Sequence, residues 1–409
     1  MRVAFVVNDL QLSGGVGVVV QHARQLVSRH GFEVELVLAR EQDEPDWRYP
    51  GLEDVPVRAM PSARGERYDI VVATWWETVA ASLELDARRH AYFVQSLEDR
   101  FYRPDQPDRL GAALTHDLPL HVITEARWIA DTLDELYPER RCLLVRNGVD
   151  KAVFAPLETA PIRRTEPLRI LVEGDADVWF KGVGEAVAAT RAMTAPRHVT
   201  LVSRSGAALD GVDRALGRQT AEQMSALYAE SDVVLKLSRV EGMFGPPLEG
   251  FHRGATCVVT AVTGHEEYVE HGFNGLIVEW DDERGTARAL DTLATDRALL
   301  HLLRANALQT ARAWPSWEQA GTMMAGALHA LARAPEAAPL DGAAAALATA
   351  RAAIESQAMR VAERDRLRYR VAGLAAFERV IERPPLRWIA AGPRALWSAA
   401  RRAKARRRR

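Results

Sequence analysis

The chain has 409 residues, of which 48% are hydrophobic and 26% charged, so it is too long for one ordinary core and too apolar to be disordered. Ten positive charges follow Glu382, with no acidic residue among them. The whole chain has a net charge of −2, so residues 1–382 alone carry −2 minus 10, or −12. No apolar run is long enough for a membrane span or a signal-peptide core, which favours a cytoplasmic protein.

Short β-branched runs alternate with helical patterns through the first 150 residues. The predicted strands are 3–7, 34–38, 70–73, 92–95, 122–124 and 143–145, and helices fit at 17–29 and 127–136. After Pro156, Pro161 and Pro167 the alternation restarts, with strands at 168–173, 199–202, 233–237, 257–260 and 276–279. The pattern predicts an α/β protein with two Rossmann-like domains, residues 1–155 and 156–335.

Beyond residue 335 the composition changes to alanine and arginine. Leu347, Ile354 and Val361 lie seven apart, which predicts a helical extension over 336–382, either docked on the body or in a short coiled coil. Residues 383–409 then form a basic tail. The two cysteines, Cys142 and Cys257, lie far apart in apolar stretches and are expected to be buried thiols.

A glycine-rich turn follows the first predicted strand. Ser13, Gly14, Gly15 and Gly17 lead directly into a helix, so backbone amides and a helix N-terminus could face an anion. The glycine spacing differs from the dinucleotide-binding fingerprint. The alternative is a turn needed only for packing of the strand and the helix.

Two further turns carry candidate binding groups. Lys181 precedes a helix in the second half, where its ammonium could pair with a phosphate, and the chain has only four lysines. A solvated surface lysine is the alternative. Asn147 and Asp150 lie in a turn just before the proline-rich segment, where they could line the edge of an interdomain cleft.

The most informative stretch is residues 238–249. A strand ends there, a glycine-rich turn around Glu241 and Gly242 exposes amides, and a proline-started helix carries Glu249 in its predicted first turn. This spacing lets the two carboxylates bind different hydroxyl groups of one extended ligand. An acidic first turn that complements the helix dipole would explain Glu249 alone, but not the turn around Glu241.

With these residues the chain resembles glycosyltransferase family 4, which has the GT-B fold. Supporting motifs occur in the family's order at 13–15, 146–150, 181–182, 227–233, 263–264 and 272–275, and the likeness covers about residues 1–330. Residues 92–102 and 240–249 are most similar to rhamnosyltransferases of bacterial rhamnan and surface-polysaccharide synthesis. The resemblance implies two Rossmann-like domains facing a cleft, with a nucleotide-diphosphate sugar in the second and an acceptor in the first.

The resemblance also assigns roles by position. It implies that Lys181 and Glu241 are catalytic, that Lys181 takes the diphosphate, and that Glu249 binds the ribose. It also implies that Glu241 and the backbone amides of Met243 and Phe244 hold the donor sugar. The remaining implied donor-binding residues are Gly14, Gly15, Arg204, Gly242, Met243, Phe244 and Gly245. Arg204 is included because the family's usual arginine before the lysine is missing, and Gln95 stands on the acceptor side where many members have a histidine.

The implied reaction is a retaining transfer without a metal or other cofactor, with L-rhamnose from dTDP-rhamnose as the expected donor sugar. Asp175 and Asp177 could instead bind a magnesium diphosphate, but loop aspartates are common and the GT-B fold does not require a metal. Alternatives are a GT-B nucleotide-sugar epimerase and a non-catalytic nucleotide-sugar-binding scaffold.

The composition of the tail is typical of a membrane surface segment. Trp388 and Trp397 are interleaved with arginines and precede the terminal cluster of arginines at 406–409. We therefore expect contact with anionic lipid at the inner membrane face, near a glycan or lipid-linked acceptor. Nucleic-acid binding is disfavoured by the acidic body, and a solubilising tail by the tryptophans.

Overall fold

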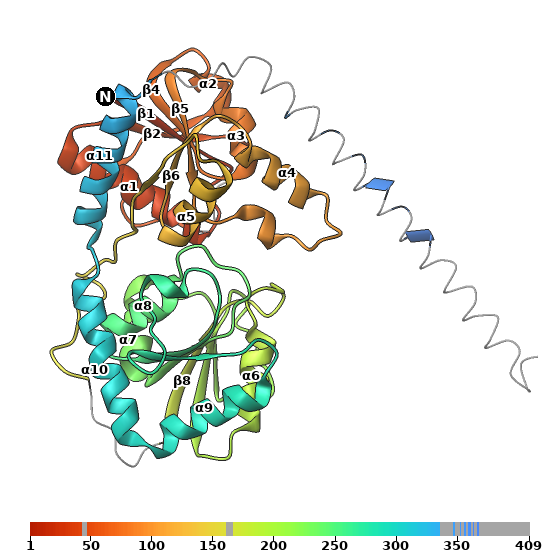
Figure 1. The fold of residues 1–409 in the computed structure, drawn as a ribbon, viewed down its shortest axis with the longest axis vertical. Coiled ribbons are helices and arrows are strands. Elements are labelled where there is room, and N and C mark those ends of the chain that lie inside the picture. Colours follow the sequence, from red (N-terminus) through yellow and green to blue (C-terminus); the bar gives the residue numbers. More distant parts are fainter. Residues whose placement is uncertain are drawn as a thin grey trace, which may run out of the picture. The chain divides into compact units, whose positions relative to one another are not determined.

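The computed structural model describes residues 1–42, 47–160 and 167–335, with isolated helical positions between 347 and 367. Met1–Pro104 and Asp108–Ala348 form one compact unit that holds two parallel β-sheets (Figure 1). Most of the predicted extension, the whole basic tail and part of the proline-rich linker lie outside the described residues. Within these residues no helix combines the length and hydropathy needed to cross a bilayer.

The first sheet has seven parallel strands in the order β3-β2-β1-β4-β5-β6-β7. The strands are β1 (Arg2–Val7), β2 (Glu33–Leu38), β3 (Val57–Ala59), β4 (Arg67–Ala73), β5 (Asp86–Val94), β6 (His121–Thr124) and β7 (Cys142–Leu144). The six strands expected in this half are confirmed to within a few residues, except that β5 begins six residues earlier. Edge strand β3 was not expected, because it is three residues long and carries Arg58.

Among the described residues of the first half, five α-helices accompany this sheet. They are α1 (Gly14–His30), α2 (Met60–Ala63), α3 (Trp76–Ser82), α4 (Asp108–His116) and α5 (Arg127–Leu136). The start of α1 corrects an expectation, because the helix begins at Gly14 and not at Gly17, so Gly14 and Gly15 lie in its first turn and not in a preceding loop. Ser13 is the extended N-cap, and its carbonyl accepts a hydrogen bond from Gly17 N at 3.1 Å.

The second sheet has six parallel strands in the order β10-β9-β8-β11-β12-β13. The strands are β8 (Leu168–Glu173), β9 (Arg197–Val202), β10 (Arg214–Leu216), β11 (Val233–Lys236), β12 (Thr256–Thr260) and β13 (Gly275–Val278). The helices of this half are α6 (Val183–Ala192), α7 (Ala221–Glu230), α8 (Gly245–His252), α9 (Glu283–Thr295) and α10 (Arg297–Ala313). The predicted Rossmann-like fold is confirmed for both sheets. Edge strand β10 was again too short to be expected.

The last helix of the second predicted domain packs on the first sheet's side of the molecule. α11 (Trp317–Arg333) lies against α1 (Figure 1). Its residues Met324 and Leu328 are fully buried in the same core as the first sheet. A Cβ on Gly321 would lie 2.4 Å from the Cβ of Gln25, so the two helices approach closely. Residues 156–335 were expected to form the second domain. Within that range, helix α11 packs in the core of the first sheet instead.

Two chain segments cross between the sheets side by side. Val149 forms a parallel bridge with Ser316, and Trp314 Nε1 donates to Asn147 O at 2.9 Å. A Cβ on Gly148 would lie 2.4 Å from Trp317 N, which explains the glycine in this motif. The turn around Asn147 therefore fixes the connection between the domains.

Candidate functional site

The candidate site lies where the strand order of the second sheet reverses. β8 and β11 are neighbours, and the chain proceeds from β8 towards β10 on one side and from β11 towards β13 on the other. Parallel α/β sheets bind ligands outside the carboxyl ends of their strands at such a switch point. Here the loops after β8 and β11 carry Lys181 and Glu241, respectively.

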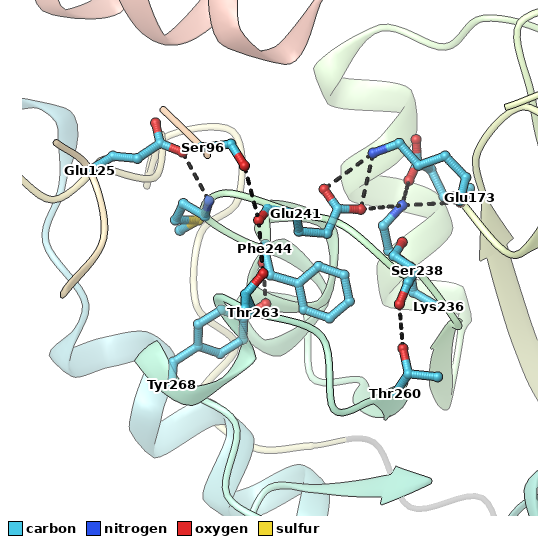
Figure 2. A network of polar contacts seen from close by, with 12 residues as sticks. Ser96, Glu125, Glu173, Lys236, Ser238, Glu241, Phe244, Thr260, Thr263 and Tyr268 are labelled. Atoms are coloured by element: carbon cyan, nitrogen blue, oxygen red, sulfur yellow. Dashed lines mark hydrogen bonds and ion pairs between the residues drawn. The ribbon is translucent and has the colours of Figure 1, made fainter. Parts of the chain in front are cut away.

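The structure brings Lys181 and Glu241 into direct contact. Lys181 Nζ donates to Glu241 Oε1 at 3.0 Å and to Oε2 at 3.2 Å. Figure 2 shows the Glu241 carboxylate within this network of polar contacts. The carboxylate is almost buried, whereas 28% of the lysine side chain is exposed. Gly182, the left-handed N-cap of α6, follows the lysine directly. An ammonium near a helix N-terminus and beside a polar loop is suited to an anionic ligand.

The loop from Glu241 to Phe244 is held through its carbonyl groups. Glu241 O accepts from Ser96 Oγ at 3.4 Å and from Thr263 Oγ1 at 3.3 Å. Gly242 O accepts from Trp128 Nε1 at 2.9 Å. The Tyr268 hydroxyl donates to Phe244 O (Figure 2). Ser96 and Trp128 come from the first half of the chain, so the loop is fixed by both halves.

Two glycines make this close contact possible. A Cβ on Gly242 would lie only 1.7 Å from Gln95 O, and a Cβ on Gly264 would lie 2.1 Å from Gly242 O. Gly264 also has a φ of +94°. By contrast, Gly245, the first residue of α8, has open space around it, and the prolines that follow it donate no hydrogen bonds.

The amide of Met243, expected to hold the donor sugar, has a protein partner in this structure. Met243 N donates to Glu125 Oε1 at 2.9 Å, and Asn147 Nδ2 donates to Glu125 Oε2 at 2.7 Å. Burial raises the pKa of Glu125 to about 7, although both hydrogen bonds oppose this rise. A ligand that took the Met243 amide would have to displace the Glu125 carboxyl group.

Glu249 occupies a different position from the one expected. α8 starts at Gly245, so Glu249 is its fifth residue and lies outside the first turn. The helix dipole therefore does not account for it. Burial raises the pKa of Glu249 to about 7, and a hydrogen bond from Tyr228 opposes the rise.

Gln95, expected on the acceptor side, lies beside Gly15 in the first turn of α1. A Cβ on Gly15 would lie 3.2 Å from Gln95 Oε1, whereas Gly14 has open space. Gln95 Nε2 donates to Thr74 O at 3.3 Å. Since Gln95 O also lies against Gly242, the chain brings Gly15, Gln95 and the Glu241 loop to one place.

Arg204 pairs with one of the two aspartates that suggested a metal site. Arg204 N donates to Asp175 Oδ1 at 2.5 Å, and its Nε lies 3.5 Å from Asp175 Oδ2. The arginine side chain is 58% exposed, so it can move. Across the part of the chain that the structure describes, no group of three His, Cys, Asp or Glu residues could hold a metal ion.

Two charged residues at this site, Lys236 and Glu173, were given no role from the sequence. Lys236, the last residue of β11, has a side chain only 1% exposed, and its Nζ lies 2.5 Å from Glu173 Oε2 and 3.9 Å from Glu241 Oε1 (Figure 2). A feature of the sequence could have revealed Lys236. It ends the otherwise apolar strand Val233–Lys236, in a chain with only four lysines. Two of these four lysines therefore surround Glu241.

Glu98, which belongs to the stretch 92–102 that carries the resemblance but was given no role, lies on the first domain near Gln95. Its Oε2 accepts from Tyr92 Oη at 2.7 Å and from Trp76 N at 2.5 Å. The carboxyl group is fully buried, and burial raises its pKa to about 8. At neutral pH this glutamate therefore holds a proton more often than not.

The chain is similar to known proteins both in sequence and in structure. Residues 172–296 match the sequence model of a family described as glycosyl transferases group 1. No curated protein sequence matches the chain.

Three solved structures illustrate the structural similarity. Alr3699/HepE from Anabaena, in complex with UDP and glucose, aligns with a TM-score of 0.65 and 17% identity over 81% of this chain and 100% of that one. Sucrose-phosphate synthase (tll1590) from Thermosynechococcus elongatus aligns with a TM-score of 0.66 and 16% identity over 81% and 98%. A TarM mutant from S. aureus, in complex with Fondaparinux, alpha-GlcNAc-glycerol and UDP, aligns with a TM-score of 0.61 and 8% identity over 80% and 99%.

At these identities the structural matches establish the fold, and the sequence match is confined to the second half of the chain. That half contains the switch point with Lys181, Glu241 and Glu249. The chain therefore has the GT-B fold of glycosyltransferases, and its second domain carries the sequence pattern of group 1 glycosyl transferases.

Proposed function

We propose that this protein is a glycosyltransferase that uses a nucleotide-diphosphate sugar and works with retention of configuration and without a metal. The second domain binds the donor, and the first domain binds a glycan or lipid-linked acceptor. The observation that carries the proposal is the convergence of Lys181, Glu241 and the glycine-rich loop at the switch point of a sheet within the matched region 172–296.

The proposed chemistry uses these groups for charge stabilisation. The bond between the anomeric carbon and the diphosphate oxygen breaks as the acceptor oxygen bonds to that carbon on the same face. The acceptor proton passes to the leaving diphosphate, whose growing charge is met by Lys181 and oriented amides. Glu241 holds the donor sugar, and Glu249 accepts hydrogen bonds from the ribose.

For the sugar we propose L-rhamnose from dTDP-rhamnose, on the resemblance of residues 92–102 and 240–249 to surface-polysaccharide rhamnosyltransferases. UDP-glucose is the reference donor for the test, because Alr3699/HepE was crystallised with it. We further propose that the protein works at the inner membrane face, held there by its basic tail.

The test is to incubate the protein with dTDP-rhamnose, UDP-glucose or GDP-mannose and a mixture of lipid-linked and free glycan acceptors. A glycoside product together with free nucleoside diphosphate supports the proposal. A rearranged nucleotide sugar without an acceptor product would indicate an epimerase instead. Binding with neither product would favour the non-catalytic scaffold.

A further inference from the structure

The charged cluster at the switch point contains two lysines that differ in their freedom to move. The side chain of Lys181 is 28% exposed and extends from a loop, whereas that of Lys236 is 1% exposed and extends from the central strand β11. Both ammonium groups approach the same carboxylate, that of Glu241 (Figure 2).

Lys236 is fixed by the neighbouring strand. Its Nζ donates to Glu173 Oε2 at 2.5 Å and to Glu173 O at 3.3 Å, and Glu173 is the last residue of β8. Burial alone would lower the pKa of Lys236, but the carboxylates of Glu173 and Glu241 outweigh it and raise the pKa. The ammonium therefore stays charged and stationary 3.9 Å from Glu241 Oε1.

The Lys181 contact poses a problem for the proposed function. Lys181 cannot keep both hydrogen bonds to Glu241 and also turn fully to a diphosphate. When it moves, an almost buried carboxylate loses its nearest counter-ion, which is destabilising unless another cation replaces it. A protonated Glu241 would then present a different hydrogen-bonding pattern to the donor sugar.

We infer that Lys236 is a positioning residue, the fixed counter-ion that keeps Glu241 ionised and oriented when Lys181 turns to the donor diphosphate. The inference rests on the proposed function and deepens it. The two lysines therefore have different roles. Lys181 is the movable cation that binds the ligand, and Lys236 is the immobile cation that stays beside Glu241. Glu173 balances the charge of Lys236 while the donor site is empty.

The test measures proton uptake when UDP or dTDP binds, by calorimetry in buffers of different ionisation enthalpy. The test variant is Lys236→Met with Glu173→Gln, which leaves no unpaired buried charge in that pair. The matched control is Lys151→Met, because Lys151 lies in a loop and contacts Arg312 O. If the variant with Lys236→Met and Glu173→Gln does not fold, the variant with Lys236→Gln and Glu173→Gln makes the same change of charge.

Other carboxyl groups near Glu241 also exchange protons. Burial raises the pKa values of Glu125 and Glu249 to about 7, and Lys181 and Glu173 also contribute to the local field. Each variant is therefore repeated with Glu241→Gln. The difference between the two backgrounds isolates the proton on Glu241.

We expect the test variant to take up more protons per bound nucleotide at pH 7 than wild type and Lys151→Met, and Glu241→Gln should abolish the excess. Equal uptake in all variants would overturn the role of Lys236 while leaving the donor site in place. If wild type binds neither nucleotide, the proposed donor site itself is wrong, and the inference falls with it.

Discussion

Glu241 and Glu249 lie in different parts of the site, so their removal should change different kinetic constants. Glu241 lies at the loop beside Lys181 and Glu249 lies on α8. We expect Glu241→Gln to lower kcat by about 10²-fold or more, because the proposed function assigns Glu241 to the reacting sugar. Glu249→Gln should raise the donor KM about tenfold, the effect of losing a hydrogen bond to a charged group.

Steady-state kinetics with varied donor concentration separate these effects. Glu230→Gln is a matched control, since Glu230 ends α7 and pairs with Arg214 at the surface. Equal rises in KM with unchanged kcat for both site variants would remove Glu241 from the chemical step.

Glu98 should make the stability of the protein depend on pH. Burial raises its pKa from 4.5 to about 8, so the folded state keeps a proton that the unfolded state releases. The stabilisation from this group is complete below pH 4.5 and is lost as the pH rises through 8. The shift corresponds to several kcal/mol, at about 1.4 kcal/mol per pKa unit.

Urea unfolding of Glu98→Gln and wild type at pH 5 and pH 8 tests this expectation. The free energy of unfolding should fall less between these pH values in the variant, because its amide does not ionise. Exposed Glu84, which pairs with Arg64, provides the control substitution Glu84→Gln. An unchanged pH dependence in the Glu98 variant would show that the carboxyl group is ionised in the fold.

Catalysis should not need a divalent cation. Asp175 is engaged with Arg204, and the diphosphate charge can be met by Lys181 and backbone amides. We expect turnover in excess EDTA to stay within twofold of that with added magnesium. Loss of turnover in EDTA that magnesium or manganese restores would instead assign Asp175 and Asp177 to a metal.

At this scale the sequence predicts which residue types gather at the site but not their partners. Lys181 and Glu241 were recognised separately from their turns, yet their hydrogen bonds depend on how the loops after two strands fold together. Lys236 was overlooked because a strand pattern reveals burial and not the Glu173 side chain on the neighbouring strand. The pairing of Met243 with Glu125 joins residues 118 positions apart, which no local pattern indicates.

At the scale of elements, the loop after β11 depends on the absence of a side chain at Gly242. An added Cβ would lie 1.7 Å from Gln95 O, so Gly242→Ala must separate the loop from its neighbour. The separation would also weaken the Trp128 hydrogen bond to Gly242 O. We expect a loss of at least 2 kcal/mol in the free energy of unfolding, towards the upper range for overpacking.

Thermal unfolding of Gly242→Ala checks this value against a glycine without such a contact. Gly326 lies on the exposed face of α11 with nothing near its added Cβ, so Gly326→Ala should stabilise the protein by about 1 kcal/mol. If the two variants melt alike, the loop has room to relax and the close approach is not a constraint.

The elements themselves were largely predictable, for a physical reason. Central strand β12 is buried along its whole length and appears as an uninterrupted run of Thr, Cys and Val, and β8 contains the buried apolar run 170–172. Short edge strands β3 and β10 lack that signal. The position of α11 was also not predictable, because its apolar face, with Met324 and Leu328, would fit either domain, and only the return of the chain beside Val149 decides which one it covers.

At the scale of the whole molecule, the remaining prediction concerns the separation of charge along the chain. Residues 1–382 carry −12, and residues 383–409 carry ten positive charges with Trp388 and Trp397 among them. An acidic body is repelled by an anionic bilayer, so any attraction must come from the tail. Each basic residue near such a surface contributes about 1 kcal/mol before screening, and tryptophan favours the headgroup level.

We therefore expect full-length protein to sediment with vesicles that contain anionic lipid, and a chain ending at Glu382 to remain in the supernatant. Binding should weaken steeply between 0.1 and 0.5 M salt, because the Debye length falls below about 10 Å over this range. Replacing Trp388 and Trp397 with serine keeps every charge and so measures the apolar contribution separately. Vesicles of neutral lipid are the control, and equal sedimentation of the full-length and shortened chains would place the membrane contact on the body, against its charge.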